Sequence, residues 1–418
     1  MKNVVITGVG VVSPIGTGWK AWSEGLRSGR SGTQGIQLFD PVDPQGQPLP
    51  CRVAAQALDF EPSAHIEPSD LKRVPRAVPM ALCAAREAVC SSGLELESLS
   101  LEQKRDFSVV IGSGGGGFSF AEAQFSLWYR GQTKWLSPYA ISSSIAGMVS
   151  SEISIALGLR GRSHTVSDGC TSSTDAFGYA LDLIRSGRVK KLICGGVDAP
   201  ITPGTIAAFC LMRAVPTHWN EHPAAAARPF GADRDGFVLG EGAWMFTLEE
   251  EEEALARGAK VWARVAGYGA SCEAFHRVAL SEPAEAARAM KMALEDADLE
   301  AERIGYVNLH GTGTQQNDPL ETRAVKLALG EHKAHATPMS ATKSQVGHAQ
   351  GASGAAGIAA ALAALNEGFL PPTINLEHPD PECDLDYIPG HSRPAQVEAA
   401  LCNCLGFGSK NAAIVLTR

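Results

Sequence analysis

One cysteine of this chain stands where a nucleophile would be expected. Cys170 follows a strand-like run, residues 163–167, and a glycine, and it precedes residues 174–184, which have helical spacing. A cysteine at a helix N-terminus lies among unpaired backbone N–H groups and at the positive end of the helix dipole, which favours the thiolate. The alternative is a buried, inert thiol, the usual state of a free cysteine. The residues next to Cys170 do not decide between the two interpretations.

Further residues capable of hydrogen-bond and proton chemistry follow in the second half of the chain. His310 opens a glycine–threonine run, and Lys343 and His348 flank a second glycine turn. Each histidine lies at a strand end or a glycine turn, where side chains of α/β folds reach a shared crevice. Cys170, His310, Lys343 and His348 could therefore converge on one site. We expect no metal there, because local ligand spacing such as His-x-x-x-His is missing.

The elements around these residues predict an α/β protein built from two related halves. In each half we expect a first buried strand, a strand that runs into a glycine turn, and a short strand followed by a turn and a helix. Alternating strands and helices favour mostly parallel sheets covered by helices. The halves should meet near residue 255, which gives domains at 1–255 and 256–418. The predicted strands are 3–10, 108–111, 163–167, 191–197 and 243–248, then 260–267, 304–310, 339–342, 403–407 and 411–416.

Composition narrows the class of protein. The chain has 418 residues, a formal net charge of -9 and 44% hydrophobic residues, which is typical of a globular protein and argues against a nucleic-acid binder. The ten cysteines show no framework spacing, so reduced thiols and a cytoplasmic location are expected. The N-terminus reads as a strand rather than a signal sequence. The small-residue run 351–365 is predicted as a buried core helix, and no membrane association is expected.

Several ordered motifs run through the chain. They are Ser167-Asp168-Gly169-Cys170-Thr171-Ser172, Arg228-Pro229-Phe230, the run 233–242, His310-Gly311-Thr312-Gly313-Thr314, Lys343-Ser344-Gln345-Val346-Gly347-His348, Pro371-Pro372-Thr373 and Gly406-Phe407-Gly408. Together they resemble the motifs of the β-ketoacyl-acyl-carrier-protein synthases, the condensing enzymes of the thiolase fold. A chance match of ordered motifs spread over so much of the chain is very improbable. The resemblance covers essentially the whole chain and implies a layered αβαβα architecture.

The resemblance implies decarboxylative Claisen condensation of malonyl-acyl-carrier protein with an acyl chain on Cys170. His310 and His348 would stabilise the enolate, and backbone N–H groups of Cys170 and Phe407 would form the oxyanion hole. Lys343 would act through a network with Glu321, although a purely structural ion pair is the alternative. Asp318 is expected to support this network. The resemblance places Thr312 and Thr314 on the pantetheine arm and Phe407 as a gating aromatic beside the cysteine. No cofactor is implied, because substrates travel on the phosphopantetheine arm of the carrier.

The motifs also bear on the subfamily. The run Asp168-Gly169-Cys170-Thr171-Ser172 looks more like the ketosynthases of type II polyketide systems, whereas Gly406-Phe407-Gly408 is closer to fatty-acid enzymes. We therefore expect a polyketide ketosynthase acting on polyene or aromatic chains, with a fatty-acid elongating 3-oxoacyl synthase II as the alternative. Gly115 stands where fatty-acid relatives often carry a bulky aliphatic residue, which predicts a deeper acyl pocket.

The resemblance also implies binding partners, and two alternative functions have to be weighed. The family implies an acyl-carrier protein, and either a homodimer or a heterodimer with a cysteine-less chain-length factor. A non-catalytic, cavity-shaping subunit is disfavoured by the retained Cys170. A degradative thiolase needs a second cysteine, for which Cys402 and Cys404 are candidates. An acidic carrier requires a basic patch, although a solvated helix face is an equally good explanation. The candidate docking residues are Lys72, Arg73 and Arg76 at the start of a predicted helix 71–91, Lys134 and Arg213.

Overall fold

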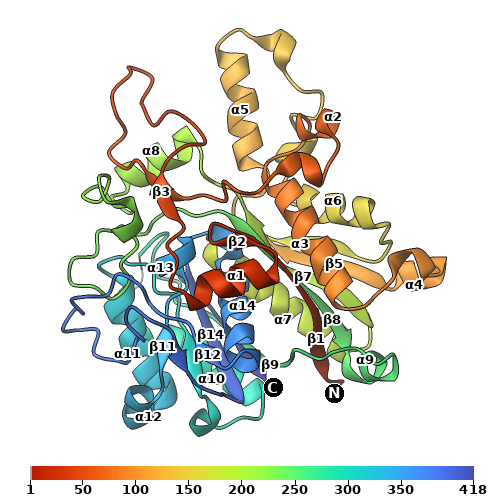
Figure 1. The fold of residues 1–418 in the computed structure, drawn as a ribbon, viewed down its shortest axis with the longest axis vertical. Helices are drawn as coiled ribbons and strands as arrows, with labels where there is room; N and C mark the ends of the chain where they lie inside the picture. The colour runs from red at the N-terminus through yellow and green to blue at the C-terminus, as the bar shows by residue number, and fades with distance from the viewer. Residues whose placement is uncertain (1, 280) are drawn as a thin grey trace.

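Two sheets of matching topology, joined into one continuous sheet where β1 pairs with β9, form the framework of the computed structural model, which describes residues 2–279 and 281–418 (Figure 1). The strand order β6-β5-β7-β8-β1 in the first half is repeated as β11-β10-β14-β15-β9 in the second. Parallel and antiparallel pairs occur at equivalent places in both. The strands are β1 (Val4–Ser13), β5 (Phe107–Gly112), β6 (Ser163–Val166), β7 (Lys191–Asp198), β8 (Gly242–Glu250), β9 (Ala263–Cys272), β10 (Tyr306–Asn308), β11 (Met339–Ser340), β14 (Ala399–Gly406) and β15 (Lys410–Thr417).

Helices form three layers around the two sheets. α3 (Ala77–Ser91) and α6 (Met148–Leu157) cover the outer face of the first sheet, and α10 (Pro283–Asp296) and α11 (Asn317–Leu329) lie on the second half. α7 (Ser172–Arg185) and α14 (Ser353–Asn366) lie between the sheets, because each contacts strands of both halves. This arrangement confirms the α/β fold class and the layered αβαβα architecture predicted from the sequence.

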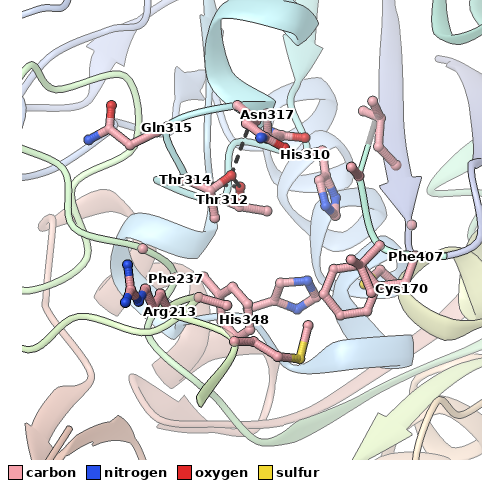
Figure 2. Close-up of a pocket in the computed structure, with 18 of the residues that line it drawn as sticks. Cys170, Arg213, Phe237, His310, Thr312, Thr314, Gln315, Asn317, His348 and Phe407 are labelled. Carbon is pink, nitrogen blue, oxygen red and sulfur yellow. Dashed lines mark hydrogen bonds between the residues drawn. The ribbon is translucent and has the colours of Figure 1, made fainter. Parts of the chain in front are cut away.

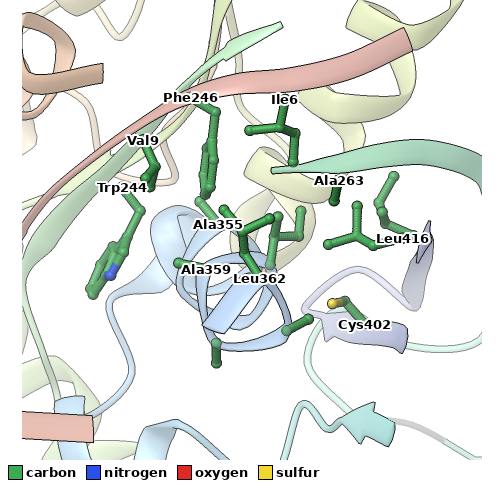
Figure 3. Close-up of a cluster of buried hydrophobic side chains, with 14 of the residues drawn as sticks. Ile6, Val9, Trp244, Phe246, Ala263, Ala355, Ala359, Leu362, Cys402 and Leu416 are labelled. Carbon is green, nitrogen blue, oxygen red and sulfur yellow. The ribbon is translucent and has the colours of Figure 1, made fainter. Parts of the chain in front are cut away.

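The central layer explains the small-residue run of the second half. Every residue of α14 from Ser353 to Leu365 is buried, as predicted for a core helix. Its alanines and glycines allow close approach, since a Cβ atom at Gly357 would lie 2.5 Å from Oδ1 of Asn308. Ala355, Ala359 and Leu362 pack against side chains from both sheets (Figure 3). No helix in the described part of the chain is long and apolar enough to cross a bilayer.

Each central helix is preceded by a single 3-10 turn. η5 (Gly169–Thr171) leads into α7, and η8 (Gln350–Ala352) leads into α14. The two turns contact one another. The duplicated topology therefore brings the residue stretches that carry the candidate nucleophile and the second histidine to the same place.

An apolar face projects from the first half. α5 (Phe118–Tyr129), which was not predicted, extends away from the body in Figure 1. It continues through the 3-10 turn η4 (Ser142–Ser144) to α6, and Gly204 of α8 (Pro203–Leu211) donates to Glu122 of α5. The exposed side chains of this apolar face are Phe118, Phe125, Trp128, Ile141, Ile145, Ile155 and Leu211.

The predicted helix 71–91 begins later than expected. Pro75 interrupts it, because proline lacks the N–H group and restricts the residue before it. Lys72 and Arg73 therefore lie in a turn between α2 (Pro68–Leu71) and α3. The predicted boundary near residue 255 falls in α9 (Glu251–Ala256). The remaining elements are α1 (Trp19–Arg27), α4 (Leu101–Arg105), α12 (Glu331–Ala336), α13 (Lys343–Val346), β2 (Gly16–Thr17), β3 (Thr33–Gly35), β4 (Val53–Ala55), β12 (Phe369–Leu370) and β13 (Arg393–Pro394).

Candidate active site

Cys170 lies in the 3-10 turn between β6 and α7, where its side chain is buried. Ser172 holds the turn, because its hydroxyl accepts the N–H of Asp168 at 2.8 Å and donates to the carbonyl of Gly169 at 2.6 Å. Burial raises the pKa of the Cys170 thiol above its ordinary value, against the lowering effects of the Phe407 N–H and of Lys343. Loss of solvent therefore opposes the helix terminus at this thiol, and the thiolate stays a prediction.

His310 follows β10, and its backbone is fixed from two sides. Glu321 accepts the N–H groups of His310 at 2.6 Å and Gly311 at 2.7 Å. Lys343 donates to the carbonyl of His310 at 2.6 Å and contacts Nδ1 of the ring at 3.2 Å. A lysine ammonium has no acceptor, so Nδ1 accepts and the ring proton lies on Nε2. Glu321 and Lys343 are thus joined through the backbone of His310.

The ring of His348 is oriented in the same way. The backbone N–H of Gln350 points to Nδ1 of His348 at 3.0 Å, and the hydroxyl of Ser353 lies 3.0 Å from the same atom. A backbone N–H can only donate, so the proton of His348 also lies on Nε2. Burial, reinforced by Lys343, places the pKa of both histidines well below the ordinary value. Both rings are therefore neutral donors.

The three reactive side chains converge. The cysteine sulfur and one nitrogen of each histidine lie within 4.8 Å of one another, and the histidine rings are nearly perpendicular, with centroids 5.5 Å apart. A cation would face the buried ammonium group of Lys343, which lies against the ring of His310. The arrangement suits a nucleophile with two hydrogen-bond donors better than a metal, and the prediction of no metal stays a prediction.

An outer cavity of about 470 Å³ leads to these groups. Figure 2 shows Cys170 and Phe407 at one end of it and Arg213 and Gln315 at the other. Thr312 and Thr314 line its wall and lie 3.0 Å apart, hydroxyl to hydroxyl. Behind them, buried Asp318 accepts the N–H groups of Phe230 and Gly313 and so holds the loop that carries the threonines.

Comparison with known proteins decides the family. The model of the β-ketoacyl synthase N-terminal domain matches residues 1–254, and that of the C-terminal domain matches residues 262–377. The chain belongs to the β-ketoacyl synthase family. It is accordingly a condensing enzyme, an acyltransferase with the thiolase fold.

Relatives from two pathways are similar to this β-ketoacyl synthase over its whole length. It is 40% identical to 3-oxoacyl-acyl-carrier-protein synthase 2 of Synechocystis sp., covering 100% of this chain and 98% of the relative. It is 39% identical to the ketoacyl synthase alpha subunit of the tetracenomycin polyketide synthase of Streptomyces glaucescens, covering 100% and 97%.

Solved structures give the same result. The ishigamide ketosynthase/chain length factor matches with a TM-score of 0.89 at 35% identity, covering 100% of this chain and 99% of that chain. A type II polyketide ketosynthase bound to its acyl-carrier protein and a hexaketide, AntDE:AntF, matches with a TM-score of 0.90 at 29% identity and the same coverage.

Gly115 of this β-ketoacyl synthase lies in a separate inner cavity of about 240 Å³. A Cβ atom at Gly115 would meet only Oδ1 of Asp198, at 3.5 Å, so the cavity has room for a side chain there. The inner cavity is bounded by α5, α8, the glycine run 114–116 and Gln350, which also lines the outer cavity.

The candidate docking residues separate into two groups. Arg76 donates two hydrogen bonds at 2.9 Å to fully buried Glu241, so its charge is neutralised internally and its role is structural. Arg73 pairs with Asp70 at the exposed surface, and Lys134 lies over the exposed ring of Trp135. Arg213 lines the mouth of the outer cavity. Lys72 is exposed in the turn before α3.

The second-half cysteines do not suit a thiolase. The Cys404 thiol donates to the carbonyl of Cys170 at 3.1 Å, and burial raises its pKa to about 12. Cys402 lies in the core against the carbonyl of Gly357. Cys170 is the only cysteine among the described residues that line the outer cavity. Neither Cys402 nor Cys404 is therefore placed to exchange a proton with substrate.

Three polar residues near the site were not predicted. Lys410 forms an ion pair with Asp168, which joins the loop of Phe407 to the cysteine turn. Asp198, at the end of β7, accepts N–H groups of Gly114, Gly115 and Gly351. Gln350 borders both cavities. Of these three residues, only Asp198 could have been predicted from the sequence, because it ends a buried strand and strand ends carry site residues in such folds.

Proposed function

We propose that this chain joins an acyl group on Cys170 to malonyl-acyl-carrier protein by decarboxylative Claisen condensation. The observation that carries the proposal is the convergence of a buried thiol with two neutral imidazoles whose Nε2 protons are free for substrate. The fixed tautomers supply donors without the reorganisation that would reduce transition-state stabilisation.

In the first half-reaction, Cys170 takes the acyl group from the carrier. The sulfur of Cys170 forms the new thioester bond as the bond between the acyl carbon and the pantetheine sulfur breaks, and the cysteine proton ends on the pantetheine thiol. The backbone N–H groups of Phe407 and of Cys170 itself act on the cysteine thiol and lower its pKa. The same two N–H groups would accept the oxyanion of the tetrahedral intermediate.

In the second half-reaction, malonyl-acyl-carrier protein enters the outer cavity. His310 and His348 donate to its thioester carbonyl while the carbon–carboxylate bond breaks and carbon dioxide leaves. The resulting enolate carbon attacks the Cys170 thioester, the carbon–sulfur bond breaks, and the 3-oxoacyl chain remains on the carrier. The returning cysteine sulfur takes up a proton. Lys343 acts as a positioning residue by holding the His310 ring.

The pathway favoured by the motif around Cys170 is that of a type II polyketide synthase, in which this chain is the catalytic ketosynthase for a polyene or aromatic product. Fatty-acid elongation as a 3-oxoacyl synthase II is the alternative, since a relative with that name is equally similar. A non-catalytic cavity-shaping subunit is least favoured, because the cysteine and both histidines are assembled.

Two surfaces support protein partners. Arg213 at the cavity mouth, with Arg73, Lys72 and Lys134, provides the cationic groups for an acidic acyl-carrier protein. The apolar face on α5, η4, α6 and α8 suits a second chain of the same fold, either a copy or a chain-length factor, because the inner cavity opens between α5 and α8. We propose a cytoplasmic location on the grounds that all ten cysteines are free.

The test follows acylation and condensation separately. The enzyme is incubated with acyl-acyl-carrier protein and its intact mass is measured, then malonyl-acyl-carrier protein is added and the 3-oxoacyl product is quantified. We expect one acyl adduct on the wild type, none on Cys170→Ala, and a normal adduct on Cys90→Ala, which removes an exposed thiol. An adduct that persists in Cys170→Ala would refute the assignment.

A further inference from the structure

Gln350 adopts a backbone conformation that side chains disfavour. Its φ angle is +45°, in the left-handed region. It is the first residue of η8, and the first residue of the equivalent turn η5 is Gly169, whose φ angle is +67°. The repeat therefore requires positive φ at this place, which glycine meets without strain. The second half keeps glutamine there instead.

The positive φ angle of Gln350 can be explained by its backbone N–H group, but this does not explain why the side chain is glutamine. The left-handed turn aims the N–H of Gln350 at Nδ1 of His348. Glycine would supply the same N–H at lower conformational cost. Strain retained at a functional site calls for a role of the group that causes it. The amide side chain must therefore be accounted for separately.

Gln350 borders both cavities. Gln350 lines the outer cavity together with Cys170, and it lines the inner cavity together with Gly115. Its Nε2 is buried and has no hydrogen-bond partner among the described residues. A buried, unpaired amide donor is unfavourable unless a ligand completes its hydrogen bond.

Besides Gln350, the polar side chains of the inner cavity are Ser119, Asp198 and Thr205. Asp198 cannot serve as a donor. The two oxygens of Asp198 accept the N–H groups of Gly114, Gly115 and Gly351 and the hydroxyl of Ser113. These bonds saturate the carboxylate with internal donors. Much of the remaining wall consists of glycine, alanine, proline and phenylalanine. Among these groups, the amide of Gln350 is the buried donor without a partner, and it belongs to the residue that lines both cavities. It can therefore distinguish an oxygenated acyl chain from a hydrocarbon chain.

We propose that Gln350 is a specificity-determining residue that hydrogen-bonds an oxygen on the acyl chain carried by Cys170, and so selects unreduced 3-oxoacyl chains over saturated ones. The inference rests on the proposed function and identifies the substrate class of the same site. A saturated chain entering the inner cavity leaves the amide unpaired, whereas a 3-oxo group can accept its hydrogen.

The experiment compares two acyl-carrier-protein thioesters of equal length, one 3-oxoacyl and one saturated, in single-turnover acylation of Cys170 followed by intact mass. We expect the wild type to favour the 3-oxoacyl group by about tenfold, the value of one buried hydrogen bond. Gln350→Leu and Gln350→Gly should bring the ratio close to one. Gln350→Gly also relieves the positive φ, so it folds even if the leucine variant does not. Gln316→Leu, the same change at the cavity mouth, is the matched control and should keep the ratio.

A ratio that does not change in Gln350→Gly, or a wild type without preference, would overturn the inference. The ratio cancels any general slowing of acylation caused by a disturbed site, because both thioesters react with the same Cys170. Absence of an adduct from both thioesters on the wild type would instead count against the proposed function.

Discussion

Replacing Lys343 with methionine tests whether this residue positions His310 or is only a structural ion. Methionine fills similar space but cannot donate to Nδ1 and the carbonyl of His310, which Lys343 contacts at 3.2 and 2.6 Å. Without that donor, Nδ1 can carry the ring proton and Nε2 then loses its hydrogen toward substrate. A hydrogen bond from a charged donor contributes about 1.5–3 kcal/mol, which corresponds to a roughly 10- to 150-fold slower decarboxylation.

The assay measures carbon dioxide released from malonyl-acyl-carrier protein in a single turnover, alongside the rate of Cys170 acylation. Decarboxylation should fall by the stated factor and acylation by much less, since Lys343 lies against His310. Lys326→Met, which removes a surface charge on α11, is the control. Equal losses in both steps, or unchanged decarboxylation, would refute the positioning role.

Three further predictions concern the thiol, the inner cavity and the docking surface. Because burial raises the pKa of Cys170, acylation should accelerate about tenfold per pH unit from about pH 6 to 9, whereas decarboxylation, which uses histidines already neutral, should stay flat in rapid-quench measurements. Gly115→Phe should fill the inner cavity and shorten the product found by mass spectrometry, and unchanged product length would contradict this. Arg76→Met should lower the free energy of unfolding in urea by about 3 kcal/mol, since it leaves Glu241 charged and buried, yet the KM for acyl-carrier protein should not rise. Arg73→Met is the matched surface control and should show the reverse pattern.

The buried strands and helices that occur in both halves of the fold were predicted well from the sequence. Buried strands such as 191–197 and the small-residue helix 353–366 were found because their composition leaves one stable environment, the interior. α5 was missed because its aromatic residues are exposed, so no hydrophobic side pointed to a core. Helix α3 was placed too early because Pro75 was read as part of it.

The candidate site was predictable in its residues but not in its electrostatics. Spacing and turns indicated Cys170, His310, Lys343 and His348, yet the state of the thiol depends on how much solvent the fold removes. Gln350 was overlooked, because its conformation and its unpaired amide exist only after both halves have packed. Arg76 shows the same limit, since its partner Glu241 is distant in sequence.

Strand β1 sets a timing problem for the biosynthesis of this protein. Its ten residues are all buried, and they pair with β8 and β9, so that Thr7 meets Thr247 across 240 residues of chain. At ribosomal rates of about 5–20 residues per second, the strand emerges roughly 10–50 s before its partners. During that interval an apolar, β-prone segment has no sheet to join and is exposed to aggregation. Yield of active enzyme should therefore respond to chaperone supply and to growth temperature more than the packing of the finished fold suggests.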